Sequence, residues 1–360
     1  MDYDLSERTR DLVAALIVKN EAPVIARCMD SLVDHVGRIF VNDNGSTDNT
    51  LAIVEKYDVS VPVPGEWVDF AYNRNLVLDA ARRMGKYVLC GIDADEELVV
   101  PENYVWPKLT ADAYSVDVHL QGLVYPRTAI VRSVHPWKWR YPIQEGLYSA
   151  LPSKVEALPG VYIKSYRGEG ARAKDPDTQQ KDLAVLVAYV LKHPEDPRMV
   201  FYLAQQYKDM GILDMAVQAY SERLQLGGYE AERWYSQYML GRIDDWQGRD
   251  PTVELLKAFE LDPTRAEPMF HAADYYRRKQ RHAVAFALAS TAAMLSMPKS
   301  GLFVERDVYE WRILDLLATV AWYTPFKEAG LTASELLMQC PVPPEHIKRV
   351  ARNHEFYTRM

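Results

Sequence analysis

Short apolar runs alternate with stretches of helical periodicity along the first hundred residues. Leu12–Val18 is apolar throughout, as expected of a strand that is covered on both faces. The same pattern predicts further strands at Arg38–Val41, Val59–Val63 and Tyr87–Ile92, and helices at Val24–Val33, Asn49–Tyr57 and Phe70–Met84. Asn44–Asp48 turns the chain, and Thr47 or Asp48 is expected to cap the helix that follows. Alternation of this kind predicts an α/β fold with crossover connections and a mostly parallel sheet.

The periodicity changes twice further along the chain. From Ala113 to Tyr166 it is strand-like and interrupted by prolines, which predicts antiparallel additions and loops. After about Asp175 the strands end and an all-α region is expected. Its small and aromatic residues have the spacing of a tetratricopeptide helix–turn–helix unit: Leu203, Ala204, Tyr207, Gly211, Ala216 and Tyr220.

A second copy supports a repeat architecture. Ala273 and Tyr276 repeat the Ala204/Tyr207 pair about two periods of ~34 residues later. Leu240-Gly241 indicates a degenerate copy between them. An irregular helical bundle with chance spacing is the alternative. We therefore expect two domains, residues 1–175 (α/β) and residues 176–360 (helical repeats).

Composition restricts the class of protein. The 360 residues are 48% hydrophobic and 26% charged, as in ordinary globular proteins. The apolar runs are too short to cross a membrane, and Met1–Arg10 has no apolar core, so neither a membrane partner nor a signal peptide is expected. The three cysteines share no CxxC spacing, which favours the cytoplasm. A net charge of −8 argues against a surface that coats nucleic acid.

Candidate chemistry lies where the predicted strands end, because ligands of open parallel sheets bind beyond the carboxyl ends of the strands. The first strand is followed by Asn20 and Glu21, the second by Asp43, and the fourth by Asp93 and Asp95. These polar groups are expected to converge on one site. The turns contain no GxGxxG or GxxxxGK[ST] sequence, which argues against a dinucleotide site or a P-loop.

Asp93 and Asp95 are one residue apart. On an extended segment alternate side chains point the same way, so both carboxylates can face one site. A divalent cation typically binds one or two such carboxylates together with diphosphate oxygens and water. It would then offset the charge of a departing nucleoside diphosphate. An acidic surface loop is the alternative interpretation.

Several ordered motifs resemble the family 2 glycosyltransferases, which have the GT-A nucleotide-diphospho-sugar transferase fold. The resemblance rests on Ile17–Glu21, Val41–Thr50, Trp67–Asn75 and Ile92–Leu98, and continues through Gln144–Gly146, Gly168–Pro176 and Phe201–Tyr207. It is strongest to a branch with a C-terminal tetratricopeptide region, which includes bacterial and phage-encoded enzymes.

The resemblance implies a binding site for a UDP-sugar donor. Asp43 would accept a hydrogen bond from uracil N3–H, and Asn20 and Glu21 would line the nucleoside pocket. Asp93 would hold the ribose or a metal-bound water, and Asp95 would hold the Mn²⁺ or Mg²⁺ ion. Three cationic side chains would contact the donor phosphates or sugar: Arg74 on its helix, and Arg172 and Lys174 in a glycine-flanked loop. The alternative is that these are ordinary exposed basic residues.

The family also implies a general base for an inverting single displacement. Members commonly have His-Glu where this chain has Gln144-Glu145, so Glu145 is the candidate base and a structural carboxylate the alternative. Many members carry a further histidine, a possible third metal ligand, where this chain reads Ile163–Arg167. Water would then complete the metal shell, or the affinity for metal would fall.

The resulting hypothesis is a cytoplasmic, metal-dependent hexosyltransferase, located in the host cytoplasm if phage-encoded. Its acceptor would be a peptide, a glycan or a modified nucleic-acid base, and its helical domain would support acceptor binding or homo-oligomer formation. Two alternatives come from other classes. One is a non-catalytic repeat scaffold with a nucleotide-sugar-binding domain. The other is a sugar nucleotidylyltransferase, which usually needs a glycine-rich basic loop where this chain has Lys19–Pro23.

Overall fold

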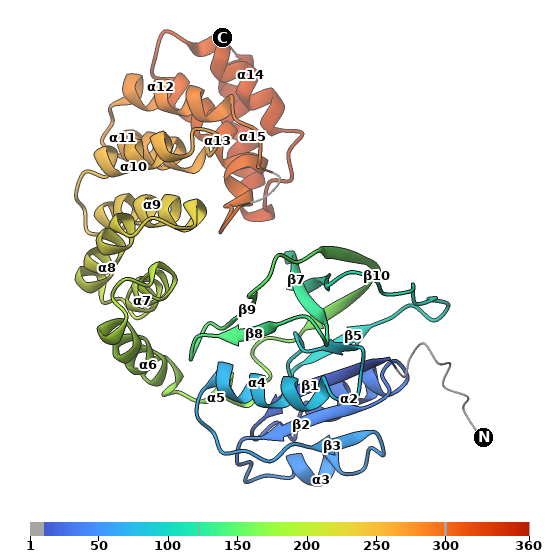
Figure 1. Ribbon diagram of the computed structural model, residues 1–360. Coiled ribbons are helices and arrows are strands. Elements are labelled where there is room, and N and C mark those ends of the chain that lie inside the picture. Colours follow the sequence, from blue (N-terminus) through green and yellow to red (C-terminus); the bar gives the residue numbers. More distant parts are fainter. Residues whose placement is uncertain (1–10, 122, 299–300, 360) are drawn as a thin grey trace. The chain divides into compact units, whose positions relative to one another are not determined.

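The computed structural model describes residues 11–121, 123–298 and 301–359, and the chain forms two compact units, Met1–Val185 and Leu186–Met360 (Figure 1). The expectation of no signal peptide in Met1–Arg10 lies outside the described residues. The limit between the units falls within helix α6 (Thr178–Lys192). The domain limits expected from the sequence stay a prediction.

An eight-stranded sheet forms the centre of the first unit. In spatial order its strands are β3 (Ser60–Pro62), β2 (Ile39–Asp43), β1 (Leu12–Val18), β4 (Tyr87–Leu89), β7 (Leu123–Arg132), β6 (Ala113–Leu120), β10 (Val155–Ser165) and β5 (Glu96–Val99). β1 pairs in parallel with β2 and β4, and β2 pairs in parallel with β3. Only β7 and β5 run against their neighbours. The prediction of a mostly parallel sheet is confirmed.

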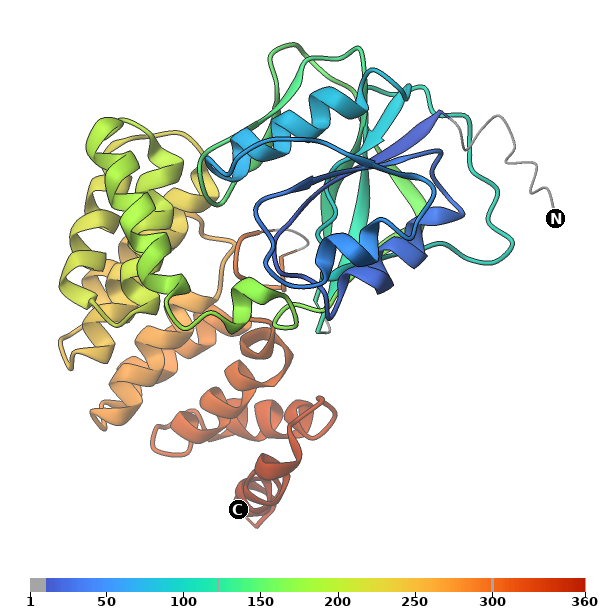
Figure 2. The ribbon, with the colours of Figure 1, turned by 90° about the horizontal axis from the view of Figure 1, so that it is seen from below.

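Layers of helix cover both faces of this sheet, as the apolar run of β1 predicted. Leu16 packs in one cluster with helix α2 (Ile25–Val33), close to α3 (Thr50–Val54). Val13 packs in the opposite cluster with α4 (Phe70–Ala81) and with a hairpin of β8 (Trp137–Arg140) and β9 (Gly146–Ser149). Figure 2 shows α4 on one side of the sheet and α2 and α3 on the other.

Some element limits differ from the expected ones. β4 ends at Leu89 instead of Ile92, because the amides of Cys90 and Gly91 both donate to the carbonyl of Ala129 and interrupt the ladder. β10 pairs in parallel with β6, so the strands between residues 113 and 166 are not all antiparallel.

The helix starts follow local side chains. Asp48, one of the two expected caps, accepts a hydrogen bond from the Thr50 amide at 2.9 Å. Asn49, the N-cap residue of α3, makes no side-chain cap bond within the described part of the chain. Asp69 caps α4 by accepting from the Tyr72 amide at 2.7 Å.

The second unit is helical throughout its described part, apart from connecting segments. It contains α7 (Pro197–Asp209), α8 (Leu213–Gln225), α9 (Glu230–Trp246), α10 (Thr252–Leu261), α11 (Glu267–Arg278), α12 (His282–Ala293), the π-helix η1 (Val308–Arg312), α13 (Ile313–Ala321), α14 (Lys327–Leu337) and α15 (Pro344–Thr358). Successive helices pack as pairs, from α7 with α8 to α13 with α14 (Figure 1).

Small residues allow the paired helices to approach closely. Ala204 of α7 and Ala216 of α8 are fully buried, and Ala273 of α11 is buried in the corresponding position. A Cβ added to Gly241 of α9 would lie 2.7 Å from the Leu255 side chain of α10. The helical repeat predicted from these spacings is confirmed.

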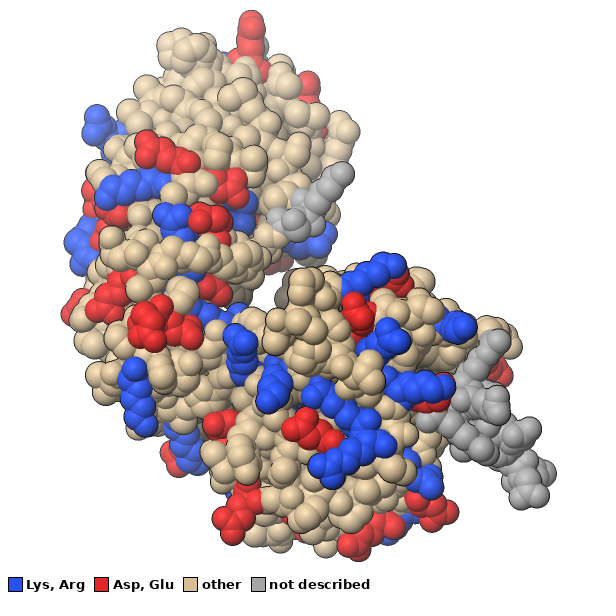
Figure 3. Space-filling view, viewed as in Figure 1, with Lys and Arg blue, Asp and Glu red and all other residues tan. Residues whose placement is uncertain are grey.

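Three further expectations can be compared with the structure. No helix in residues 11–121, 123–298 and 301–359 is long and apolar enough to cross a membrane. Cys28 and Cys90 are buried free thiols, and Cys340 is a partly exposed one. Figure 3 shows Lys and Arg side chains interspersed with Asp and Glu on one face of each unit.

Candidate active site

The loops after β1 and β2 are joined by hydrogen bonds. Asn20 has a φ of 58°, the left-handed conformation that Asn tolerates better than most residues. Its side-chain Oδ1 accepts from the Thr47 backbone amide at 2.7 Å, and its backbone amide donates to Ser46 Oγ at 2.9 Å. Ser46 Oγ in turn donates to Asp43 Oδ1 at 2.5 Å. These bonds hold the Asp43 carboxylate in place where β2 ends.

Three buried amides lie behind this loop. Asn73 of α4 donates from Nδ2 to Asn42 Oδ1 and to Asn44 Oδ1, each at 2.9 Å. Asn42 Nδ2 donates to the Val63 carbonyl at 2.8 Å. The network fixes the end of β2 against α4. The sequence assigned no role to these residues, although Asn73 lies inside the Trp67–Asn75 motif.

Arg74 connects two of the predicted site carboxylates. It is only 8% exposed, so the interpretation as an ordinary surface arginine is wrong. Its Nε donates to Glu145 Oε1 at 2.8 Å and its Nη2 to Asp93 Oδ1 at 2.5 Å. Its guanidinium also lies over the Trp139 ring, 5.0 Å from the centroid. Burial would lower the pKa of Arg74, but the charges of Asp93 and Glu145 raise it well above its ordinary value.

A second arginine supports the turn that carries the acidic residues. Arg127 of β7 forms a two-point ion pair with Glu96, at 2.7 and 3.0 Å, and Glu96 Oε2 accepts from the Asp93 amide at 3.0 Å. Burial would raise the pKa of Asp93, but Arg74 and Arg127 hold that pKa below its usual range. Asp93 therefore carries a negative charge near neutral pH. Neither Glu96 nor Arg127 was singled out in the sequence, and Arg127 has no sequence signal.

Asp95 and Glu21 meet at the segment before α5 (Ala171–Lys174). A Cβ added to Gly170 would lie 3.1 Å from Asp95 Oδ2 and 3.5 Å from Glu21 Oε2. Glu21 accepts from the Ala171 amide at 3.2 Å. Burial raises the pKa of Glu21 to about 7, together with the charges of Asp95 and Asp93 and against that hydrogen bond. Burial and the neighbouring Asp93 charge also raise the pKa of Asp95.

The prediction that Asp93 and Asp95 point the same way because they lie on one extended segment is wrong. Ala94 and Asp95 form a turn, in which the Glu96 amide donates to the Asp93 carbonyl at 3.0 Å. The two side chains therefore do not share a face by strand alternation. Asp93 bonds to Arg74, whereas Asp95 lies beside Gly170 and Glu21.

Arg172 and Lys174 lie on the single-turn helix α5 and not in an open loop. Arg172 lies over the Phe70 ring at 4.7 Å and forms an ion pair with Asp182. Lys174 is exposed, and its charge acts to lower the pKa of Glu21. Lys174 is thus electrostatically coupled to the acidic groups, while Arg172 has partners of its own.

The residues present fit a cation that also binds a phosphate ligand. Within the described ranges, no group of three or more His, Cys, Asp and Glu side chains forms a complete metal-binding set. Mg²⁺ and similar ions commonly use only one or two carboxylates, with substrate phosphates and water as the remaining ligands. Burial, followed by the charges of neighbouring carboxylates, raises the pKa values of Asp95 and Glu21 beside Gly170. A divalent cation bound there would favour their ionised forms.

Part of the first unit is similar to known proteins. Residues 14–110 match the family model described as glycosyl transferase family 2. An uncharacterized glycosyltransferase of Rickettsia conorii is 33% identical over 90 residues, which cover 25% of this chain and 30% of that protein. One from Rickettsia felis is 36% identical over 85 residues, which cover 24% and 29%. The resemblance to family 2 glycosyltransferases is confirmed for this segment, and these matches support glycosyltransferase activity.

A longer match includes the helical unit. A TPR repeat-containing protein of Synechococcus elongatus is 26% identical over 273 residues, which cover 70% of this chain and 66% of that protein. The chain thus spans about two thirds of that relative's length and less than a third of the two glycosyltransferases. Among solved structures, MamA of Desulfovibrio magneticus is 12% identical with a TM-score of 0.36, and covers 45% of this chain and 85% of its own.

Proposed function

We propose that the chain is a metal-dependent glycosyltransferase that moves a sugar from a UDP-sugar to an acceptor by inverting single displacement. The observation that carries this proposal is the position of Arg74 between Asp93 and Glu145. The buried guanidinium of Arg74 thereby holds Asp93, the carboxylate proposed for the donor, close to Glu145, the carboxylate proposed for the acceptor. The match of residues 14–110 to glycosyl transferase family 2 supports a nucleotide-sugar donor.

In this proposal the β1 and β2 loops bind the nucleoside. Asp43 accepts a hydrogen bond from uracil N3–H, for which its bonds to Ser46 already orient the carboxylate. Cytosine has no N3–H to donate, so UDP is preferred to CDP. Asn20 shapes the pocket through its bond to Thr47, and Glu21 lines the side that faces Gly170.

Asp95, together with Asp93, would hold a Mn²⁺ or Mg²⁺ ion beside the donor diphosphate. Such an ion supplies Lewis-acid stabilisation of the departing UDP. Lys174 would add positive charge near the same carboxylates, since its charge acts to lower the pKa of Glu21. Arg172 would reach the diphosphate after leaving Asp182.

Glu145 is the proposed general base. Its Oε1 is held by Arg74 Nε, and its Oε2 would accept the proton of an acceptor hydroxyl or thiol. The ion pair with Arg74 fixes the orientation of Glu145, as a general base in a single displacement requires. The anomeric configuration is inverted because the acceptor attacks opposite to the departing UDP.

Thermal unfolding of the full chain with UDP, with and without Mn²⁺, tests the donor site. We expect UDP with Mn²⁺ to raise the midpoint more than UDP alone, since ligands that bind the native state stabilise it. Asp95→Asn should remove the Mn²⁺-dependent part and abolish UDP-sugar hydrolysis or transfer. Asp58→Asn is the matched control, because Asp58 is exposed on the same unit. Retention of metal-dependent turnover by Asp95→Asn would refute the metal role.

A binding-only protein is the second candidate, and the similarity to a TPR repeat-containing protein favours it. This candidate predicts UDP-sugar binding without turnover for every acceptor class. Glu145→Gln would then change nothing measurable, whereas the glycosyltransferase requires that it lose turnover.

A further inference from the structure

The β8–β9 hairpin of the first unit presents basic and aromatic side chains on one of its faces. Side chains alternate along β8, so its two tryptophans pack in the cluster that contains α4, whereas Lys138 and Arg140 are exposed. In the register of the hairpin, Tyr148 of β9 lies opposite Lys138, and Gly146 lies opposite Arg140. We term Lys138, Arg140 and Tyr148 the hairpin face.

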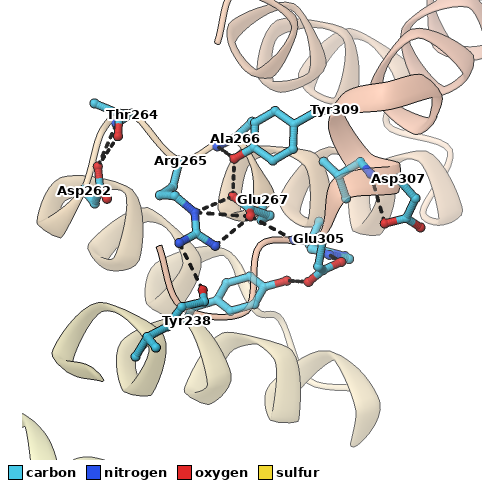
Figure 4. A network of polar contacts seen from close by, with 12 residues as sticks. Tyr238, Asp262, Thr264, Arg265, Ala266, Glu267, Glu305, Asp307 and Tyr309 are labelled. Carbon is cyan, nitrogen blue, oxygen red and sulfur yellow. Dashed lines mark hydrogen bonds and ion pairs between the residues drawn. The ribbon is translucent and has the colours of Figure 1, made fainter. Parts of the chain in front are cut away.

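The two cations of the hairpin face are not neutralised within the protein. Other charged side chains are paired, as Figure 4 shows for Arg265 and Glu267 of the helical unit, which lie 2.7 Å apart. Lys138 and Arg140, by contrast, form no ion pair with any residue of the ranges 11–121, 123–298 and 301–359. Two residues of a strand lie about 7 Å apart along its axis. The spacing of these two positive charges is therefore close to that of successive phosphates in an extended nucleic-acid strand.

The Tyr148 ring has a fixed position beside these cations. A Cβ added to Gly146 would lie 2.7 Å from Tyr148 Cε2, so the ring lies directly against the glycine. The Arg140 guanidinium is 5.3 Å from the ring centroid, and the Tyr141 ring meets it edge-on at 5.8 Å. Tyr148 nevertheless remains partly exposed. Unpaired bases stack on aromatic rings and on guanidinium planes of this kind.

The hairpin face borders the proposed general base. Gly146, the partner of Arg140 in the hairpin, directly follows Glu145 in the sequence. The turn that carries Glu145 is held against α4, because the Phe70 amide donates to the Pro142 carbonyl at 3.2 Å. A ligand bound along the hairpin face therefore lies next to the carboxylate proposed to accept the acceptor's proton.

The net charge of the chain leaves room for such a ligand. A charge of −8 argues against a surface that coats nucleic acid, but a short strand needs only a local group of cations. Exposed charges more than a Debye length away, roughly 8–10 Å, are largely screened at physiological salt. An acidic glycan would also be attracted by the two cations. The ring of Tyr148 and the guanidinium of Arg140 favour the flat face of a base over the puckered ring of a sugar.

We infer that the hairpin face binds single-stranded nucleic acid, and that a nucleotide hydroxyl is the acceptor of the sugar. Lys138 and Arg140 contact successive phosphates, and one base stacks on Tyr148. The acceptor role rests on the proposed function. In that step the hydroxyl oxygen bonds to the anomeric carbon, UDP leaves with the electron pair of the broken C–O bond, and the hydroxyl proton passes to Glu145. The binding itself does not depend on turnover.

Fluorescence anisotropy of the full chain with a labelled single-stranded oligonucleotide of about 12 nucleotides tests the binding. Lys138→Ala/Arg140→Ala should weaken it at least tenfold and reduce the slope of log affinity against log salt by about 1.4, since each phosphate contact contributes about 0.7. Tyr148→Ala should weaken binding at least fivefold, whereas Tyr148→Phe keeps the ring and should bind as wild type does. Lys56→Ala/Lys108→Ala, which removes the same charge from exposed positions of the same unit, should also bind as wild type does.

Two results overturn the binding. One is equal affinity of wild type and of Lys138→Ala/Arg140→Ala, with folding verified by circular dichroism. The other is displacement of the oligonucleotide by polygalacturonate at equal charge concentration together with no effect of Tyr148→Ala, which assigns the face to an acidic glycan.

The acceptor role is measured separately, with the radiolabelled UDP-sugar that raises the unfolding midpoint most. Label should be incorporated into the oligonucleotide, and Lys138→Ala/Arg140→Ala should raise KM for the oligonucleotide while the midpoint shift with UDP and Mn²⁺ stays unchanged. If the oligonucleotide binds and UDP with Mn²⁺ shifts the midpoint but no label is incorporated, the acceptor role is wrong. If the oligonucleotide binds but UDP with Mn²⁺ causes no shift, the proposed function fails and the nucleic-acid binding of the hairpin face stands.

Discussion

Arg74 Nε lies 2.8 Å from Glu145 Oε1, although 71 residues separate the two in sequence. The same guanidinium holds Asp93 through Nη2, so the geometry of both carboxylates depends on one side chain. Removing a partner from a buried ion pair costs more than the pair itself contributes, because an uncompensated charge is left behind. Arg74 therefore has both a structural and a functional consequence.

Arg74→Ala should destabilise the full chain by about 3–5 kcal/mol, since it leaves Asp93 and Glu145 without their common cation. Denaturant unfolding measures this, with Arg83→Ala as the control because Arg83 is exposed just beyond the same helix. Arg74→Lys should restore part of the stability but little turnover, since an ammonium group lacks the fork that serves both carboxylates. Equal stability of Arg74→Ala and Arg83→Ala would show that the ion pairs contribute nothing.

Glu145→Gln tests the general base with almost no change in shape. The amide oxygen can still accept from Arg74, so UDP affinity measured by calorimetry should stay within about twofold. Turnover should fall by about 10²–10⁴-fold, the usual contribution of general base catalysis. A variant that kept wild-type turnover would remove Glu145 from the mechanism.

Glu21 makes the first unit less stable as pH rises, which is the opposite of the usual effect of a carboxylate in a folded protein. Its folded-state pKa of about 7 lies above its ordinary value of 4.5, so the folded chain holds the proton more tightly. The corresponding stability is full below pH 4.5 and is lost as pH rises towards 7. Without divalent cations, Glu21→Gln should therefore be more stable than wild type at pH 8, by about 1–3 kcal/mol, and similar at pH 4.5. Hydrogen exchange of the β1 amides reports it, and a constant difference across this range would contradict the assignment.

Gly170→Ala would place a methyl group 3.1 Å from Asp95 Oδ2. The backbone of Gly170, at φ −64° and ψ 159°, is open to any residue, so the effect should be local to the carboxylates. We expect Mn²⁺-dependent UDP binding to weaken on the order of tenfold with little change in the unfolding midpoint. Gly168→Ala is the contrasting variant: its φ of +105° is strained, but no atom lies within 4 Å of the added Cβ. It should lose stability and keep metal dependence.

Gly241 tests the packing of the helical unit. Gly241→Ala should gain about 1 kcal/mol from helix propensity but lose about 1–3 kcal/mol from the contact with Leu255. The net change should be destabilising in urea unfolding. In the Leu255→Ala background the side-chain contact is gone and the backbone nitrogen of residue 255, at 3.1 Å, stays close, so there the same substitution should cost less. Additive effects of the two substitutions would exclude the close approach of α9 and α10.

The central strands and the repeat pattern could be predicted from the sequence because burial fixes their periodicity. Leu12–Val18 is a strand with both faces covered, and Ala204 and Ala273 are buried where the helices approach. Asp43 ends a strand and Asn20, Glu21, Asp93 and Asp95 come after strands, so their places at one edge of the sheet follow from the parallel topology. The early end of β4 could not be predicted, since it depends on Ala129, a residue of another strand.

The pairing of side chains from distant segments could not be predicted, because sequence patterns do not contain it. Arg74 was expected to face solvent or donor, but its helix places it against Glu145 and Asp93. Arg127 lies on a strand with no motif and still carries the ion pair with Glu96. Such pairs depend on how the helices and strands are aligned with one another in the fold. A shift of one element by a single residue would change every partner.

The two buried thiols can report on the opening of the acidic turn in the native chain. Cys28 lies beneath the acidic turn, where its Sγ donates to the Asp93 carbonyl at 3.5 Å, and Cys90 follows β4. Burial raises the pKa of both, so an alkylating reagent reacts with them only when that region opens, while the partly exposed Cys340 serves as an internal reference. The alkylation rate of Cys28 and Cys90 therefore measures how often the acidic turn opens, and bound nucleotide should lower that rate.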